Sequence, residues 1–102
     1  MSDHRIIHGN ITRDPELRKA GESDVASFGV AINSKFKDKD EVHFVNCEAW
    51  NKLGENICNF FDKGQEIMCW GRMKTERWEK DGEKKSKDIM VVLGFDFCGK
   101  KD

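Results

Sequence analysis

Short apolar segments with alternating hydrophobic and polar positions recur along the chain, and turn residues separate them. Side chains alternate across a strand, so this pattern predicts strands. They are expected at residues 5–11, 25–32, 42–50, 66–78 and 89–97. In the last of these we expect one face to carry Ile89, Val91, Leu93, Phe95 and Phe97.

The pattern changes period between residues 51 and 61, where Leu53, Ile57 and Phe60 or Phe61 recur at steps of three and four. This spacing predicts one amphipathic helix, which Lys63-Gly64 would end. The charged segments 35–41 and 80–87 are predicted to be loops. Three strands, one helix and two strands predict an all-β fold. The expected architecture is a five-stranded OB-fold barrel with its helix between strands three and four.

The strand at 42–50 places small residues on one face and large aromatic residues on the other. The first face carries His43, Val45, Cys47 and Ala49, and the second carries Phe44, Asn46, Glu48 and Trp50. Because two polar residues share the aromatic face, we expect the small face to point into the core. Phe44 and Trp50 are therefore predicted to face solvent, and His43 is interpreted as a buried histidine.

The strand at 66–78 sends Ile67, Cys69 and Met73 inward, so its period of two forces Met68 and Trp70 outward. An exposed tryptophan beside a methionine favours a contact between subunits. A nucleic-acid contact and incidental exposure remain as alternatives for these two side chains.

Composition narrows the function classes. The 102 residues predict a single domain at 1–102, and the formal net charge of −1 argues against a binder that relies on bulk positive charge. Residues 70–87 nevertheless hold seven basic and four acidic residues, together with Trp70 and Trp78. Lys35, Phe36, Lys37 and Lys39 repeat this mixture. Cations between aromatic rings are typical of surfaces that bind unpaired bases, although a solvated charged loop is the alternative.

Other chemistry finds little support in the sequence. No apolar stretch is long enough to span a membrane, and no nucleophile–base pair, paired carboxylates or phosphate loop indicates an enzyme. The four cysteines Cys47, Cys58, Cys69 and Cys98 form no Cys-x-x-Cys pair and have no histidine at ligand spacing. We therefore expect buried, reduced thiols, no metal site and no cofactor.

Motifs across nearly the whole chain resemble the bacterial-type single-stranded-DNA-binding protein family. Residues 9–18 (GNITRDPELR) resemble its opening motif, and residues 25–33 (VASFGVAIN) resemble its second strand. Residues 44–56, with Trp50-Asn51-Lys52-Leu53-Gly54-Glu55, resemble its third strand and the start of its helix. Gly71-Arg72 and Thr75-Glu76-Arg77-Trp78 resemble its fourth strand.

This resemblance implies an OB-fold that forms homotetramers and wraps single-stranded DNA without regard to sequence, in replication, recombination and repair. It implies stacking on bases by Phe36, Phe44, Trp50 and Trp78. Phe36 and Phe44 stand where tryptophans are common in the family, which should weaken stacking. Lys39, Lys52 and Lys74 match basic positions that contact phosphates, and Arg72 belongs to the same basic stretch.

The resemblance also implies a location and partners. The family's glycine-rich tail and acidic tip have no counterpart after Gly99-Lys100-Lys101-Asp102, which would fit a short phage- or plasmid-encoded form or a trimmed chain. Replication proteins are partners of the family, but without the acidic tip their recruitment is in doubt. We expect a bacterial cytoplasmic location, or the host cytoplasm for a phage protein. The alternative function is an OB-fold interaction module of a replication-restart or recombination complex that binds DNA weakly.

Overall fold

The computed structural model describes residues 3–98, which form six strands and one helix. The elements are β1 (His4–Ile11), β2 (Glu16–Ala20), β3 (Ser23–Phe36), β4 (Lys39–Trp50), α1 (Asn51–Phe60), β5 (Glu66–Lys80) and β6 (Glu83–Phe97). The segment Gly99–Asp102, to which the expectation about the missing tail refers, lies outside the described residues.

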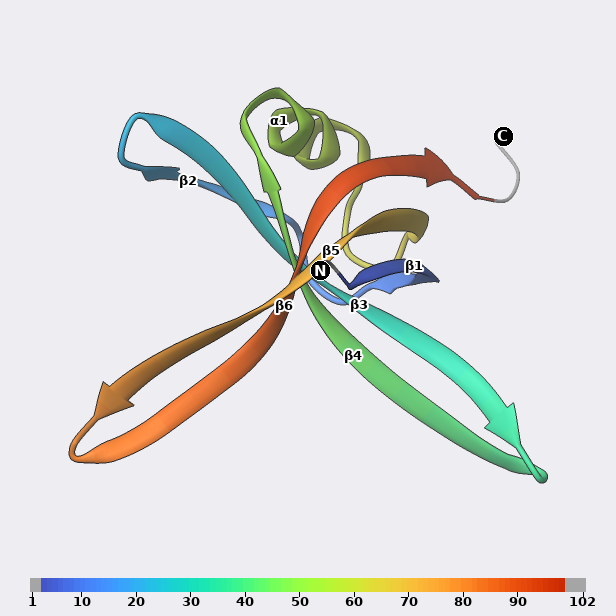
Figure 1. Cartoon of the computed structure of the whole chain (residues 1–102). Helices are drawn as coiled ribbons and strands as arrows, with labels where there is room; N and C mark the ends of the chain where they lie inside the picture. Colours follow the sequence, from blue (N-terminus) through green and yellow to red (C-terminus); the bar gives the residue numbers. More distant parts are fainter. Residues whose placement is uncertain (1–2, 99–102) are drawn as a thin grey trace.

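Five of the strands close into a barrel (Figure 1). The order is β1-β5-β6-β4-β3-β2, and an additional pairing of β1 with β3 closes the ring. All pairings are antiparallel except β4 with β6. Along the chain, α1 stands between the third and fourth barrel strands, so the architecture expected from the sequence is confirmed.

The strand β2 was not predicted. It pairs only with the first half of β3, outside the barrel ring, through a turn at Gly21 with φ of 67°. An edge strand that buries neither face needs no alternating apolar residues, and Glu16-Leu17-Arg18-Lys19-Ala20 shows none. Its sequence therefore carries no strand signal.

The core fills the barrel and the space under α1. Ile57 and Phe61, four positions apart, point from the helical segment into it, while Phe60 is exposed. The buried apolar side chains include Ile7, Ile11, Phe28, Val30, Val45, Cys47, Ala49, Ile67, Cys69, Met90 and Val92. Cys58 and Cys98 are only partly buried, so the expectation of four buried thiols is correct for Cys47 and Cys69 alone.

The predicted alternation of β6 is wrong in its middle. Trp70 pairs with Gly94 but the next residue, Gly71, pairs with Val92, so Leu93 is an extra residue in a β-bulge. A bulge changes which positions face the core on its two sides. Met90 and Val92 face the core before the bulge and Phe95 packs against it after the bulge, while Leu93 is exposed.

The two predicted loops are instead long two-stranded ribbons. β3 and β4 stay paired as far as Phe36 and Lys39, and β5 and β6 as far as Lys80 and Glu83. Each ribbon ends in a two-residue turn with positive φ at both positions, Lys37-Asp38 and Asp81-Gly82, as hairpins with tight primed turns require. Beyond the barrel both faces of a ribbon meet solvent, so charged residues replace the apolar alternation.

The interpretation of His43 as a buried histidine is wrong. His43 lies on the same face of β4 as Val45 and Cys47. The core ends at Val45, however, so the His43 side chain is exposed. Within residues 3–98, no helix is long and apolar enough to cross a membrane.

Candidate nucleic-acid interface

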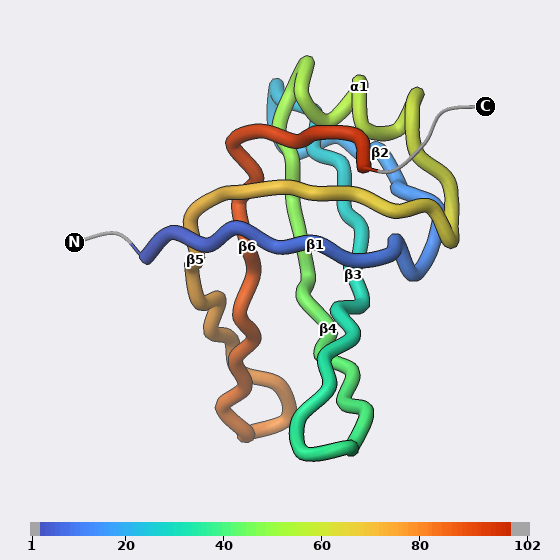
Figure 2. The backbone as a smooth tube through the Cα atoms, turned by 90° about the vertical axis from the view of Figure 1, so that its right-hand side faces the viewer, coloured from blue at the N-terminus to red at the C-terminus, as the bar shows by residue number. Residues whose placement is uncertain are grey.

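Both ribbons leave the barrel on the side away from α1 (Figures 1 and 2). We call residues 33–42 of β3 and β4 the first ribbon, and residues 74–89 of β5 and β6 the second ribbon. The first carries three lysines and three acidic residues, and the second carries six basic and five acidic residues. The excess of positive charge in residues 70–87 is thus smaller on the second ribbon, because the ribbon excludes Arg72 and includes Asp88.

One continuous sheet face joins the two ribbons. Directly opposed residues of neighbouring strands share a face. Glu48 of β4 lies opposite Val91 of β6, and Val91 lies opposite Arg72 of β5. Since side chains alternate along each strand, Phe44 and Trp50 are on this face of β4, and Lys74 and Trp78 are on this face of β5. The register therefore places five side chains selected from the sequence on the same face as Glu48. They are Phe44, Trp50, Arg72, Lys74 and Trp78.

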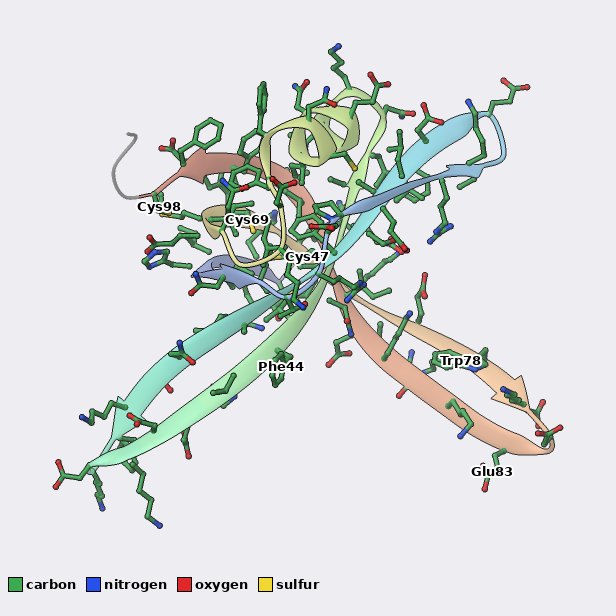
Figure 3. The ribbon with its side chains drawn as sticks, turned by 180° about the vertical axis from the view of Figure 1, so that it is seen from behind. Phe44, Cys47, Cys69, Trp78, Glu83 and Cys98 are labelled. Carbon is green, nitrogen blue, oxygen red and sulfur yellow. The ribbon has the colours of Figure 1, made fainter. Side chains whose placement is uncertain are left out.

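Two of these aromatic rings are open to a ligand. Phe44 is 72% exposed at the base of the first ribbon, and Trp78 is 43% exposed on the second (Figure 3). Trp78 lies opposite Lys85 and borders a shallow groove of about 540 Å³. The groove is lined by Arg77, Trp78, Glu79, Lys84, Lys85 and Ser86. Aromatic and cationic side chains thus line one surface there.

Trp50 is only half-buried rather than fully on a wet surface. It ends β4 and is the N-cap residue of α1, and the next residue, Asn51, has φ of 53°. The Asn51 side-chain oxygen accepts a hydrogen bond from the Asp24 backbone at 3.0 Å, which holds this turn. Lys52 extends from the first turn of the helix, where its ammonium group lies 3.8 Å from Glu55.

Phe36 and Lys39 are on the other face of the first ribbon. They oppose each other next to the turn. Lys39 and Phe44 are five positions apart in β4, so their side chains point to opposite faces. Phe36 is exposed, and the Lys37 ammonium lies 5.4 Å from its ring centre. The register does not bring these two residues together with Phe44, Lys74 and Trp78.

A buried carboxylate occupies the centre of the shared face. Glu48 is only 8% exposed, and its oxygens lie 3.4 Å from the Lys74 ammonium and 3.8 Å from the Arg18 guanidinium. A buried charge must be paired, and these two cations pair it. Lys74 also lies 3.5 Å from Glu76. Lys74 is therefore engaged by two carboxylates.

Three cations at this centre were not selected from the sequence. Arg13, Arg18 and Lys87 line a hollow of about 130 Å³ together with Glu48, Asn46 and Ile89. Arg13 follows β1, Arg18 is in the unpredicted β2, and Lys87 is in a segment predicted to be a loop. Arg13 and Arg18 lie within residues 9–18, the segment that resembles the family's opening motif. That resemblance was the one sequence signal that could have identified them as candidate phosphate contacts.

A separate apolar patch lies on the outer face of β1 and β5. Ile6 pairs with Trp70 across these strands and is well exposed, while Trp70 is 37% exposed and Met68 is half-buried. The Trp70 indole lies against Gly94, where an added Cβ would be 2.5 Å from the ring. A glycine there lets the indole cover β6, which explains its partial burial.

Comparisons with known proteins, which cover nearly the whole chain, point to one family. Residues 3–97 match the model of the "Single-strand binding protein family". A "Single-stranded DNA-binding protein" of Clostridium perfringens is 40% identical over 95 residues, covering 90% of this chain and 63% of that protein. "Single-stranded DNA-binding protein 1" of Streptococcus pyogenes is 34% identical, covering 100% of this chain and 82% of that protein.

One further relative and one solved structure complete the comparison. "Single-stranded DNA-binding protein 1" of Lactococcus lactis is 37% identical, covering 82% of this chain and 59% of that protein. The chain thus spans about three fifths of the length of the Clostridium and Lactococcus proteins. The crystal structure of a small single-stranded DNA-binding protein from Streptomyces coelicolor superposes with a TM-score of 0.82 at 16% identity, covering 96% of this chain and 95% of that chain. At this identity the likeness concerns the fold.

Proposed function

Because the chain belongs to the single-strand binding protein family, we propose that it binds single-stranded DNA without sequence preference and protects it during replication, recombination and repair. The observation that carries this proposal is the family match over residues 3–97, on a barrel whose ribbons present exposed Phe44 and Trp78 beside cations. The relatives named above bear names that state single-stranded DNA binding.

The proposed mechanism combines stacking with neutralisation of phosphates. Unpaired bases stack on Phe44 and Trp78, and every base offers a π-face, so the interaction tolerates any sequence. Trp50 extends this stacking surface at the end of β4, and Phe36 offers a further ring on the other face of the first ribbon. The phosphates are neutralised by Arg72, Lys74, Lys39 and Lys52, and the hollow at Glu48 adds Arg13, Arg18 and Lys87. A duplex hides its bases, so this surface favours single strands.

We also assign an assembly and a location to the proposal. The chain forms a homotetramer, with Met68 and Trp70 in a contact between subunits, and acts in the bacterial cytoplasm as a binding protein rather than an enzyme. The exposed pair of Ile6 and Trp70 supports the contact, because large apolar side chains left in water favour association.

The test is the affinity for a labelled oligothymidylate compared with a duplex of equal length at one fixed salt concentration. Tight binding of the single strand and weak binding of the duplex is the expected result. Equal affinities would contradict the proposal, and weak binding of both would favour a protein-interaction module. Incubation of the protein with Mg²⁺ and the labelled strand should leave the strand uncut.

A further inference from the structure

Three side chains of types that can ligate a metal meet on the outer face of the barrel. They are His8 of β1, Glu66 at the start of β5, and Cys98 directly after β6. One ligand atom from each, an imidazole nitrogen, a carboxylate oxygen and a thiol sulfur, lies within 4.8 Å of the others. We propose that the His8–Glu66–Cys98 cluster binds a transition-metal ion, and Zn²⁺ is the ion that this donor set suits.

Sheet register places the cluster. β5 lies between β1 and β6. The β1–β5 register makes Glu66 a diagonal neighbour of His8, and the β5–β6 register pairs Ile67 with Phe97, which brings Cys98 beside Glu66. Three adjacent strands therefore hold one ligand each. Cys98 is far from the tips of both ribbons (Figure 3).

The side chains of the cluster are accessible and already interact. Ile7 is buried, so the next residue of β1, His8, points outward. The His8 Nε2 atom and a Glu66 carboxylate oxygen form a short hydrogen bond of 2.5 Å. Cys98 is partly buried. An ion can thus reach the cluster from solvent.

The geometry needs only a small adjustment to hold Zn²⁺. With Zn–N near 2.0 Å and Zn–S near 2.3 Å, ligand atoms of a tetrahedral site lie about 3.5 Å apart. The His8 nitrogen and the Glu66 oxygen, now 2.5 Å apart, must separate by about 1 Å, and atoms now up to 4.8 Å apart must approach by about 1 Å, which side-chain rotation allows. Three protein ligands leave a fourth position for water.

The local charge also favours a cation. The carboxylates of Glu66 and Asp96 supply negative charge near Cys98. A divalent ion deprotonates the thiol that it binds, as thiolate ligation requires. Metal binding would connect β1 to β5 and β6 and so stabilise the folded chain.

Co²⁺ is the probe for the test, because it replaces Zn²⁺ in tetrahedral sites and absorbs light. Titration of the reduced full chain should give a thiolate-to-Co²⁺ charge-transfer band that saturates at one ion per chain and disappears when Zn²⁺ is added. Cys98→Ser should abolish the band, and His8→Ala should weaken Co²⁺ binding roughly tenfold or more. Zn²⁺ should raise the melting temperature of the wild type and not that of Cys98→Ser.

Matched controls separate the cluster from other thiols and imidazoles. Cys58→Ser changes the other partly buried cysteine, and His43→Ala changes an exposed histidine outside the cluster, so both should keep the band. No band in the wild type, an unchanged band in Cys98→Ser, or loss of the band in Cys58→Ser overturns the proposal. Oligothymidylate binding by Cys98→Ser should equal that of the wild type, so the result is independent of the proposed DNA-binding function.

Discussion

At the scale of single residues, Trp78 should contribute most directly to DNA binding. Its indole is 43% exposed, lies opposite Lys85 and borders the groove on the second ribbon. Trp78→Ala should weaken binding of an oligothymidylate by about 1–3 kcal/mol, the usual value of one stacked base. Fluorescence anisotropy of the labelled strand measures the change. Phe60→Ala removes an exposed ring on α1 and should leave affinity unchanged; equal losses in the two variants would contradict the assignment.

Glu48 should oppose DNA binding, because its buried carboxylate engages Lys74 and Arg18. Glu48→Gln removes that charge, so Arg18 becomes available to phosphates and Lys74 is engaged by Glu76 alone. We expect tighter binding at low salt and a log–log salt slope that steepens by about 0.7 for each cation gained. Glu55→Gln, which frees Lys52 on the exposed helix, is the matched control and should change affinity less. An unchanged slope in Glu48→Gln would contradict the expected competition between Glu48 and phosphates for these two cations.

At the scale of elements, the two ribbons should differ in function. Deleting Trp78-Glu79 and Lys84-Lys85 shortens the second ribbon by two paired positions and keeps its turn. It removes one aromatic ring and two lysines, so affinity should fall by at least the stacking value of about 1–3 kcal/mol. The salt slope should flatten by about 0.7 for each lysine that contacts a phosphate.

The matched deletion of Ser34-Lys35 and Asp40-Glu41 shortens the first ribbon equally. It removes two acidic residues and one lysine, and no aromatic ring. It should leave binding close to that of the wild type. Both variants should unfold at nearly the wild-type temperature, because the ribbons lie outside the core. Equal losses of affinity in the two deletions would mean that ribbon length, rather than the aromatic and basic side chains, governs binding.

At the scale of the whole molecule, the apolar patch at Ile6, Met68 and Trp70 should hold subunits together. Sedimentation at micromolar concentration should give about four times the chain mass of 11.8 kDa. Trp70→Glu introduces a charge into this patch and should reduce the mass while binding of short oligonucleotides persists. Leu17→Glu changes an exposed leucine on β2 and serves as the control. A wild-type mass near 11.8 kDa would exclude the assembly.

The sequence by itself determined the barrel strands and the helix, because each buries one face and so must alternate at a period of two or 3.6. It also selected Phe44 and Trp78 correctly as exposed rings, since both stand among polar residues in their strands. A segment that buries neither face shows no such alternation of apolar and polar positions. For that reason β2 was missed, the ribbons were taken for loops, and His43 was placed in the core.

Only the tertiary structure decided which side chains meet. The bulge at Leu93 reverses the faces of β6, and no pattern in one strand reveals a register set by its neighbour. Glu48, Lys74 and Arg18 come from β4, β5 and β2, and their ion pairs depend on strand order. The same holds for His8, Glu66 and Cys98, whose spacing along the chain gave no indication of a metal site, whereas β1, β5 and the end of β6 place the three side chains together. Contacts between distant segments depend on pairing across the sheet, which sequence spacing alone does not contain.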